Sequence, residues 1–122
     1  MESNTSLNNY ATYGGTTKTI SKGRLILTTT TSQYWILIRW GTGYKPISEV
    51  QGNNIKFKCD FECEQTVTFE SNVNNVPQDS STDGEVTMNV PSDATGCYFS
   101  IKSQNTVIYV NNVQVYVIDN AN

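Results

Sequence analysis

Apolar and polar residues alternate with a period of two along most of the chain, which is the pattern of β-strands with one buried face. The clearest case is residues 54–64, in which lysines and acids alternate with apolar residues at Ile55, Phe57, Cys59, Phe61 and Cys63. Such a run predicts an antiparallel strand with one face towards the core and a charged face towards solvent. Shorter runs of the same kind predict strands near residues 66–70, 85–90 and 97–102.

Residues 33–40 (QYWILIRW) are apolar on both faces of the strand that they predict. Strict alternation separates two sets of side chains, one with Tyr34, Ile36, Ile38 and Trp40 and the other with Gln33, Trp35, Leu37 and Arg39. A strand that is covered on both faces, or that presents Trp35 and Leu37 to a partner, has this pattern. Residues 24–31 (RLILTTTT) are its expected hairpin partner, with a turn near Thr31 and Ser32.

Glycine and asparagine mark turns between the strands, near residues 41–43, 51–53, 91–96 and 111–112. Residues 73–84 (VNNVPQDSSTDG) are expected to form one long loop. About eight strands, spaced roughly 8–12 residues apart, predict an all-β fold, an antiparallel two-sheet β-sandwich of jelly-roll type. We expect one sandwich domain at residues 17–122, preceded by an N-terminal arm at residues 1–16.

The inward positions of these strands predict a single core between the two sheets. Its expected members are Ile55, Phe57, Phe61, Val67, Phe69, Val86, Met88, Phe99 and Ile101. The arm has only Leu7, Tyr10 and Tyr13 as apolar anchors, too few to offset a backbone entropy of about 1–2 kcal/mol per residue. We therefore expect the arm to be held by hydrogen bonds to a sheet edge or by a partner, with Tyr10 and Tyr13 as its anchors.

Three cysteines occupy inward positions of the predicted strands. Cys59 and Cys63 are four residues apart on one strand, so their Cα atoms should lie about 13 Å apart, too far for a disulfide. Cys97 either pairs with one of them across the sandwich or stays a free thiol packed as a small apolar side chain. The cysteines lie on the flat inward faces of the predicted strands and lack the CxxC turn geometry of a zinc site, so no metal is expected.

The chain of 122 residues has 8 Lys+Arg, 11 Asp+Glu and no His, with a formal net charge of −3. Without histidine, Ser-His and Cys-His dyads and the common histidine metal sites are excluded. We expect a protein that is not an enzyme and has no cofactor, with a hydrolase based on two carboxylates as the remaining catalytic alternative. The acidic balance predicts no nucleic-acid partner. No apolar run approaches the about 20 residues of a membrane span, and the polar N-terminus is no signal peptide.

The run Thr106–Val113 (TVIYVNNV) resembles the closing strands of carbohydrate-binding-module-like jelly rolls, a similarity that covers about 25 residues of the C-terminal third. The resemblance implies a jelly-roll sandwich, a fold that is also used in phage virion decoration proteins. The N-terminal half has no clear counterpart of the family's opening strands.

Trp35, Arg39 and Tyr44 are the candidate binding residues, together with Tyr10 and Tyr13 of the arm. Trp35 and Arg39 share a predicted face and Tyr44 follows in the next turn. Aromatic rings beside a planar polar group suit the stacking of a sugar, and Trp, Tyr and Arg are equally the residues of protein–protein hot spots. The third alternative is that the arm or the long loop simply covers Trp35. Tyr98, Tyr109 and Tyr116 are expected outward on adjacent strands, as a second patch.

The favoured hypothesis is a non-enzymatic virion protein that decorates a phage capsid or fibre. Its expected partners are the major capsid protein, other virion proteins or a second copy of itself, and its expected location is the virion, after assembly in the host cytoplasm. The Thr-, Asn- and Ser-rich, charge-poor composition favours this hypothesis. The alternative is a β-sandwich module that binds surface glycans.

Overall fold

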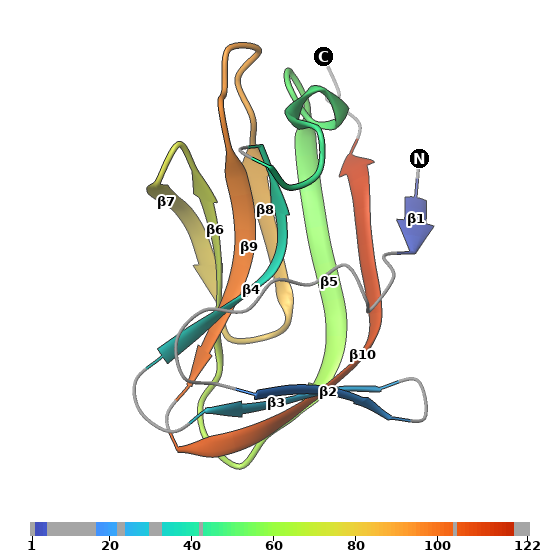
Figure 1. Ribbon diagram of the computed structural model, residues 1–122, viewed down its shortest axis with the longest axis vertical. Helices are drawn as coiled ribbons and strands as arrows, with labels where there is room; N and C mark the ends of the chain where they lie inside the picture. Colours follow the sequence, from blue (N-terminus) through green and yellow to red (C-terminus); the bar gives the residue numbers. More distant parts are fainter. Residues whose placement is uncertain are drawn as a thin grey trace.

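The computed structural model describes residues 2–4, 17–21, 24–29, 33–41, 43–103 and 105–118. Within these ranges, side chains are described for residues 26–28, 36–41, 43–103 and 105–118. The described residues form two antiparallel sheets that pack face to face (Figure 1). This arrangement confirms the predicted fold class, an all-β two-sheet sandwich, and it is compatible with a jelly-roll-like fold.

The first sheet has six strands, in the order β2-β3-β10-β5-β8, with β1 also paired to β10. Their bounds are β1 (Glu2–Asn4), β2 (Thr17–Ser21), β3 (Arg24–Thr29), β5 (Asn54–Glu62), β8 (Glu85–Asn89) and β10 (Thr106–Ile118). The second sheet has four strands in the order β4-β9-β6-β7. These are β4 (Gln33–Trp40), β6 (Thr68–Val73), β7 (Val76–Ser81) and β9 (Cys97–Ser103). The described part therefore contains ten strands, where the sequence predicted about eight.

The core lies between the sheets and is built from the inward positions of the alternating runs. Phe57 is fully buried and its neighbour Lys58 is exposed, which confirms the predicted register of β5. Phe57 packs against Phe69 and Phe99 of the opposite sheet, with ring centroids 6.3 and 5.3 Å apart. All the predicted core residues belong to this cluster, Phe61 as a partly buried member at its border.

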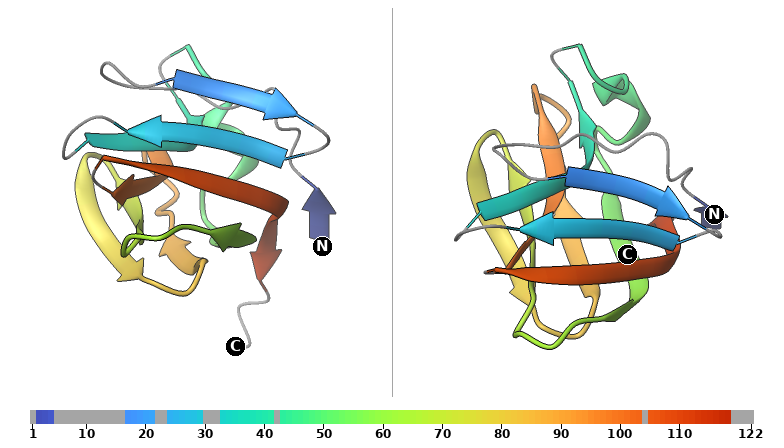
Figure 2. Two further views of the ribbon diagram at one scale, coloured as in Figure 1. Left: turned by 90° about the horizontal axis from the view of Figure 1, so that it is seen from below. Right: turned by 60° about the horizontal axis from the view of Figure 1, so that its bottom comes forward.

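β10 is the longest strand and it bends in the middle. Its register with β5 shifts between Asn111 and Gln114, and Asn112 adopts a positive φ of 54°. Asn112 also donates a side-chain hydrogen bond to Asp60 on β5, at 2.6 Å. Such a bulge turns a strand, so the first half of β10 runs beside β3, which pairs in turn with β2, across the lower end of the molecule (Figure 2).

Two sequence predictions about β3 and β4 need correction. β3 pairs with β2 and β10, whereas β4 pairs with β9 in the other sheet, so they do not form a hairpin with each other. The alternation in β4 is interrupted because its register with β9 shifts between Ile36 and Ile38. Leu37 is consequently buried in the core beside Ile38 and Trp40, and not on the face of Arg39.

The predicted long loop at residues 73–84 is also wrong, because most of it is β-structure. Val73 pairs with Val76, and the two residues between them, Asn74 and Asn75, have positive φ values of 52° and 64°. This is the two-residue hairpin turn that asparagine favours. The strand that follows it, β7, has a sequence of low strand propensity (VPQDSS) and lies at the edge of its sheet, where proline is tolerated.

The start of the N-terminal arm lies on a sheet edge. Glu2–Asn4 form β1, antiparallel to Gln114–Tyr116 of β10. Tyr10 and Tyr13 lie outside the described residues, so their role as anchors stays a prediction, as does the division into an arm and a domain at residue 17.

The three cysteines are free thiols in this structure, and none pairs across the sandwich. Burial raises the pKa of Cys59 to about 12, with a smaller contribution from the nearby Asp60 carboxylate. Burial alone raises the pKa of Cys97 to about 12. Cys63 is half-buried, and its Sγ lies 3.4 Å from Thr106 Oγ1. Cys59 and Cys97 are therefore neutral, packed side chains near neutral pH.

Candidate functional site

Arg39, Tyr44 and Tyr98 meet on the outer face of the β4–β9 pair, and we call them the Arg39 cluster. Arg39 and Tyr98 are directly opposite each other in the antiparallel register of the two strands. The guanidinium carbon of Arg39 lies 4.8 Å from the centroid of the Tyr44 ring and 5.6 Å from that of Tyr98. These distances are those of cation–π contacts. Tyr44 is 48% exposed, so the cluster presents an aromatic ring to solvent.

The turn after β4 returns Tyr44 to Arg39. Gly41 and Gly43 adopt positive φ values of 91° and 86°, which glycine adopts without strain. The turn is closed by hydrogen bonds from Gly41 N–H to Lys45 O (2.7 Å), Tyr44 N–H to Gly41 O (3.1 Å) and Lys45 N–H to Arg39 O (3.2 Å). A Cβ at Gly41 would lie 2.3 Å from the Thr95 carbonyl oxygen, so a larger residue there would displace the turn.

A short 3₁₀ helix, η2 (Ile47–Glu49), supports the same turn from the other side. Glu49 accepts a hydrogen bond from Trp40 Nε1 at 3.1 Å and lies 3.9 Å from Lys45 Nζ. Trp40 itself is buried and packs edge-on against Phe99, with centroids 6.1 Å apart. The Arg39 cluster is thus carried by a turn that is anchored in the core.

The structure brings together two of the five predicted site residues. Arg39 and Tyr44 are in contact, as the sequence suggested. Trp35 lies in β4 opposite Ile101, but its side chain is outside the described part, and Tyr10 and Tyr13 are outside it entirely. The role of these three residues stays a prediction.

Tyr98 is the residue of the cluster that sequence reasoning assigned elsewhere. It lies in β9, whereas Tyr109 and Tyr116 lie in β10 of the other sheet, so the three tyrosines do not form one patch. Alternation around Cys97 and Phe99 did place Tyr98 outward. Its contact with Arg39, however, depends on the β4–β9 pairing, which alternation alone does not reveal.

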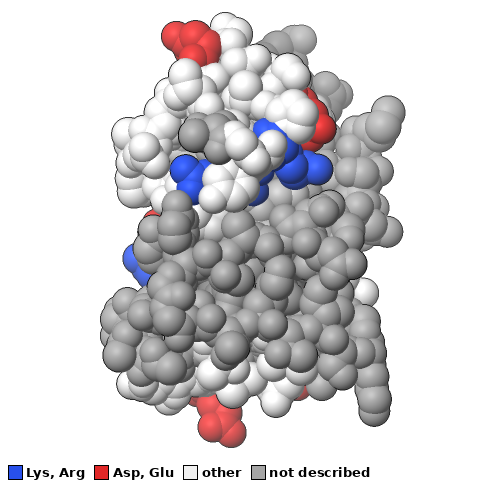
Figure 3. Space-filling view, in the orientation of Figure 1, with Lys and Arg blue, Asp and Glu red and all other residues white. Residues whose placement is uncertain are grey.

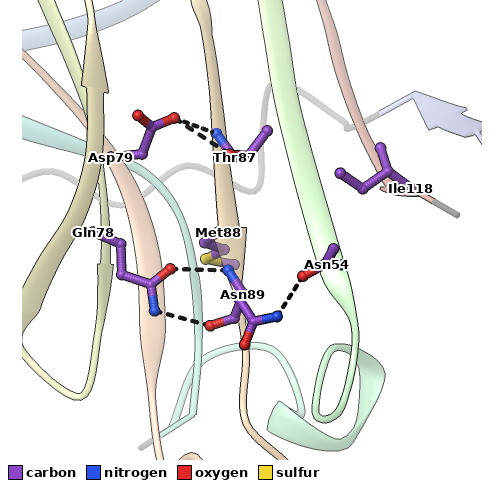
Figure 4. Close-up of a pocket in the computed structure, with 7 residues that line it drawn as sticks. All are labelled: Asn54, Gln78, Asp79, Thr87, Met88, Asn89 and Ile118. Atoms are coloured by element: carbon purple, nitrogen blue, oxygen red, sulfur yellow. Dashed lines mark hydrogen bonds between the residues drawn. The ribbon is translucent and has the colours of Figure 1, made fainter. Parts of the chain in front are cut away.

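A second candidate is a pocket of ≈310 Å³ at the free edge of β8, which we call the edge pocket (Figure 4). Gln78 of β7 uses its side-chain amide as a strand would use its backbone: it accepts from Asn89 N–H and donates to Asn89 O, both at 2.9 Å. Asp79 accepts from Thr87 N–H at 3.0 Å. Ser71 of β6 donates to Thr87 O at 2.7 Å.

The edge pocket is therefore a seam between the two sheets. β8 is an edge strand, and such strands expose backbone groups that attract other strands. Here side chains of β6 and β7 occupy those groups, and Asn89 also donates to Asn54 at 2.5 Å. The polar groups of this pocket bind each other, which leaves it poorly suited to binding a ligand.

The described residues contain no group of three or more His, Cys, Asp or Glu side chains placed to hold a metal ion. Among the same residues, no helix has the length and apolarity needed to cross a membrane.

Comparison with known proteins adds information about the fold. No protein-family model matches the chain, and no curated protein matches it in sequence. The fold is similar to a chain in the crystal structure of accessory secretory protein 1, 2 and 3 from Streptococcus pneumoniae. That likeness has a TM-score of 0.55 and covers 91% of this chain and 96% of that chain, at 12% sequence identity.

A chain of the glycosylation associate protein (Gap123) complex from Streptococcus agalactiae is also similar. Its TM-score is 0.49, with 92% of this chain and 45% of that chain covered, at 10% identity. At these identities the likeness establishes the fold alone.

These findings correct the predicted function. The similar solved structure with a TM-score of 0.55 is of a bacterial accessory secretory protein, so the prediction of a phage virion component is wrong, together with its capsid partners and its location in the virion. No protein-family model supports the resemblance to carbohydrate-binding modules or the glycan-binding alternative either. The physical reason is that β-sandwiches carry many unrelated functions, and a Thr-, Asn- and Ser-rich surface is not specific to virions.

Proposed function

We propose that this chain is a non-catalytic subunit of a bacterial multi-protein assembly, and that it binds another protein through the Arg39 cluster. The observation that carries the proposal is the stacking of the Arg39 guanidinium against Tyr44 and Tyr98, with Tyr44 48% exposed. Arginine and tyrosine are enriched among the residues that dominate protein–protein binding energy.

The chemistry of the chain supports a role without catalysis. The sequence has no histidine to act as a general base near neutral pH. Cys59 and Cys97 are buried thiols with pKa values raised to about 12, so they are not nucleophiles at neutral pH. The likeness to a chain from a structure of accessory secretory protein 1, 2 and 3 gives the assembly its bacterial context.

The surface around the cluster is compatible with this role. In Figure 3 the blue basic side chains of the described residues gather over the upper half of the face, where β4 ends and η2 follows. Because the turn is closed by three backbone hydrogen bonds, Tyr44 is held in place before a partner arrives. Little conformational entropy is then lost when the partner binds.

The test is photocrosslinking in the organism that encodes the chain. A benzophenone amino acid replaces Tyr44 in the protein, and the matched control carries it at Val76, which is 60% exposed at the start of β7. We expect a discrete adduct with a second protein from position 44 and none from position 76. Arg39→Ala should abolish the adduct without changing thermal unfolding. Identical adducts from both positions, or none from position 44, would refute the proposal.

A further inference from the structure

A larger hollow lies at the opposite end of the sandwich from the Arg39 cluster. Its volume is ≈620 Å³, within the range of protein binding sites. Its described lining includes Glu62, Cys63 and Glu64 after β5, and Thr106, Val107 and Tyr109 at the start of β10. We call it the lower hollow, because Figure 1 shows β5 ending and β10 beginning at the bottom of the molecule.

The hollow offers apolar surface to a partner. Val107 is 37% exposed, as is Val117 near the other end of β10, whereas the β10 valines at 110, 113 and 115 are buried. Tyr109 is half-buried and lies two residues further along, on the same outward face of β10. Cys63 and Thr106 contact each other at 3.4 Å and connect the two strand ends. A valine and an aromatic ring side by side can accommodate one apolar side chain.

The negative charge of the hollow favours a partner with basic side chains. Tyr109 is opposite Glu62 in the register of β10 with β5, so a carboxylate lies beside the ring. Three glutamates elsewhere have lysine partners: Glu49 with Lys45, Glu70 with Lys102 and Glu85 with Lys56. Within the described part of the chain, the side chains of Glu62 and Glu64 form no ion pair and no hydrogen bond, and both residues are exposed. Red carboxylate atoms are visible at the lower end of Figure 3.

We propose that the lower hollow docks an extended segment of a protein partner that presents basic and apolar side chains on one face. The apolar side chain packs on Val107 and Tyr109, and lysine or arginine side chains pair with Glu62 and Glu64. Glu62 ends β5 and Glu64 follows two residues later, so the partner segment presents its two basic side chains at alternate positions, about 6.6–7 Å apart on one side. This proposal goes beyond the proposed function, because it gives the chain a second binding surface of opposite charge.

The probe is the synthetic peptide acetyl-Lys-Ser-Lys-Ser-Val-amide, whose two lysines and valine lie at alternate positions, titrated into the ¹⁵N-labelled full chain at low salt. We expect amide shifts confined to residues 62–64 and 105–109, and binding that weakens at least fivefold at high salt because exposed ion pairs are screened. The acidic analogue acetyl-Glu-Ser-Glu-Ser-Val-amide should cause no shifts. Equal binding of the two peptides, shifts elsewhere, or no shifts at millimolar peptide would overturn the proposal.

Matched variants separate charge from apolar contact. Glu62→Gln/Glu64→Gln should weaken peptide binding about tenfold, whereas Asp93→Asn, which removes an exposed carboxylate in the β8–β9 loop, should not. Val107→Ser should weaken binding several-fold, and Val76→Ser should leave it unchanged. Arg39→Ala should also leave it unchanged, so failure of this proposal and failure of the Arg39 cluster are distinguishable. Loss of binding in the Asp93 or Val76 control to the same extent would refute a specific site.

Discussion

The edge pocket and the lower hollow are both concave regions with polar side chains, yet those side chains are differently engaged. In the edge pocket, Gln78 and Asp79 are hydrogen-bonded to the backbone of β8. In the lower hollow, Glu62 and Glu64 have no partner within the described part of the chain. A polar group that already has a partner stabilises the fold, whereas an exposed group without one is available to a ligand. The shape of a pocket therefore says less about binding than the engagement of its polar atoms.

The largest effect is expected at Phe57, in the core to which both sheets contribute. Phe57 is fully buried between the sheets and packs against Phe69 and Phe99. Phe57→Ala should lower the free energy of unfolding by about 3–5 kcal/mol, because it removes buried apolar surface and leaves a cavity. Urea denaturation measures the change. A loss below about 1 kcal/mol would mean that the core is not shared.

The second largest loss of stability is expected at the edge pocket, where side chains of β7 bind the backbone of β8. Gln78→Ala/Asp79→Ala removes three hydrogen bonds to the backbone of β8, and at about 0.5–1.5 kcal/mol each in mutational series we expect a loss of about 2 kcal/mol in urea. The exposed edge of β8 should also increase self-association, measured by light scattering. A matched control is Ser80→Ala, on the same strand. A stable, monomeric double variant would show that the side chains do not seal the edge.

A smaller effect comes from the buried thiols and depends on pH. The folded-state pKa values of Cys59 and Cys97 are raised from 9.0 to about 12. The neutral thiols therefore contribute stability below pH 9, and this contribution is lost as the pH rises from 9 towards 12, because the unfolded thiols ionise first. We expect a loss of about 1 kcal/mol for each thiol between pH 8 and 10. Cys59→Ala/Cys97→Ala should reduce this pH dependence; an unchanged slope would contradict the assignment.

The smallest effect is expected in the lower hollow. Glu62→Gln/Glu64→Gln should change the free energy of unfolding by no more than about 0.5 kcal/mol, as is usual for exposed positions without partners. Urea denaturation of this variant and of the Gln78→Ala/Asp79→Ala variant compares the two losses in free energy of unfolding directly. A destabilisation similar to that of the seam would remove the difference between the two regions.

The sequence predicted the parts of this fold that depend on local alternation. The charged and apolar faces of β5, and the core around Phe57, follow from a period of two that a strand imposes on its side chains. The sequence of β7 (VPQDSS) has little strand propensity, so alternation does not predict this strand. The strand is held in place by hydrogen bonds between its own side chains and β8 and by the turn at Asn74 and Asn75. The bulge at Leu37 was missed because it depends on pairing with β9.

The candidate site was predictable only in part, for the same reason. Arg39 and Tyr44 are near each other in sequence, and their contact could be inferred from the turn between them. Tyr98 and the lower hollow depend on which strands become neighbours, and pairing between distant segments leaves no trace in the local pattern. Trp35, Tyr10 and Tyr13 remain predictions from residue type.

The place of β10 in its sheet has a consequence for the order of events during synthesis. β10 lies between β3 and β5, so among the described strands the two halves of the sheet are joined only through residues 106–118. β3 and β5 are synthesised before β10 and cannot complete the sheet until it is made. Pairing between strands that are far apart in the sequence is also slow. Until then β3 and β5 each have an edge without its final neighbour. The period before β10 arrives is thus the time at which the growing chain most needs protection from association with other chains.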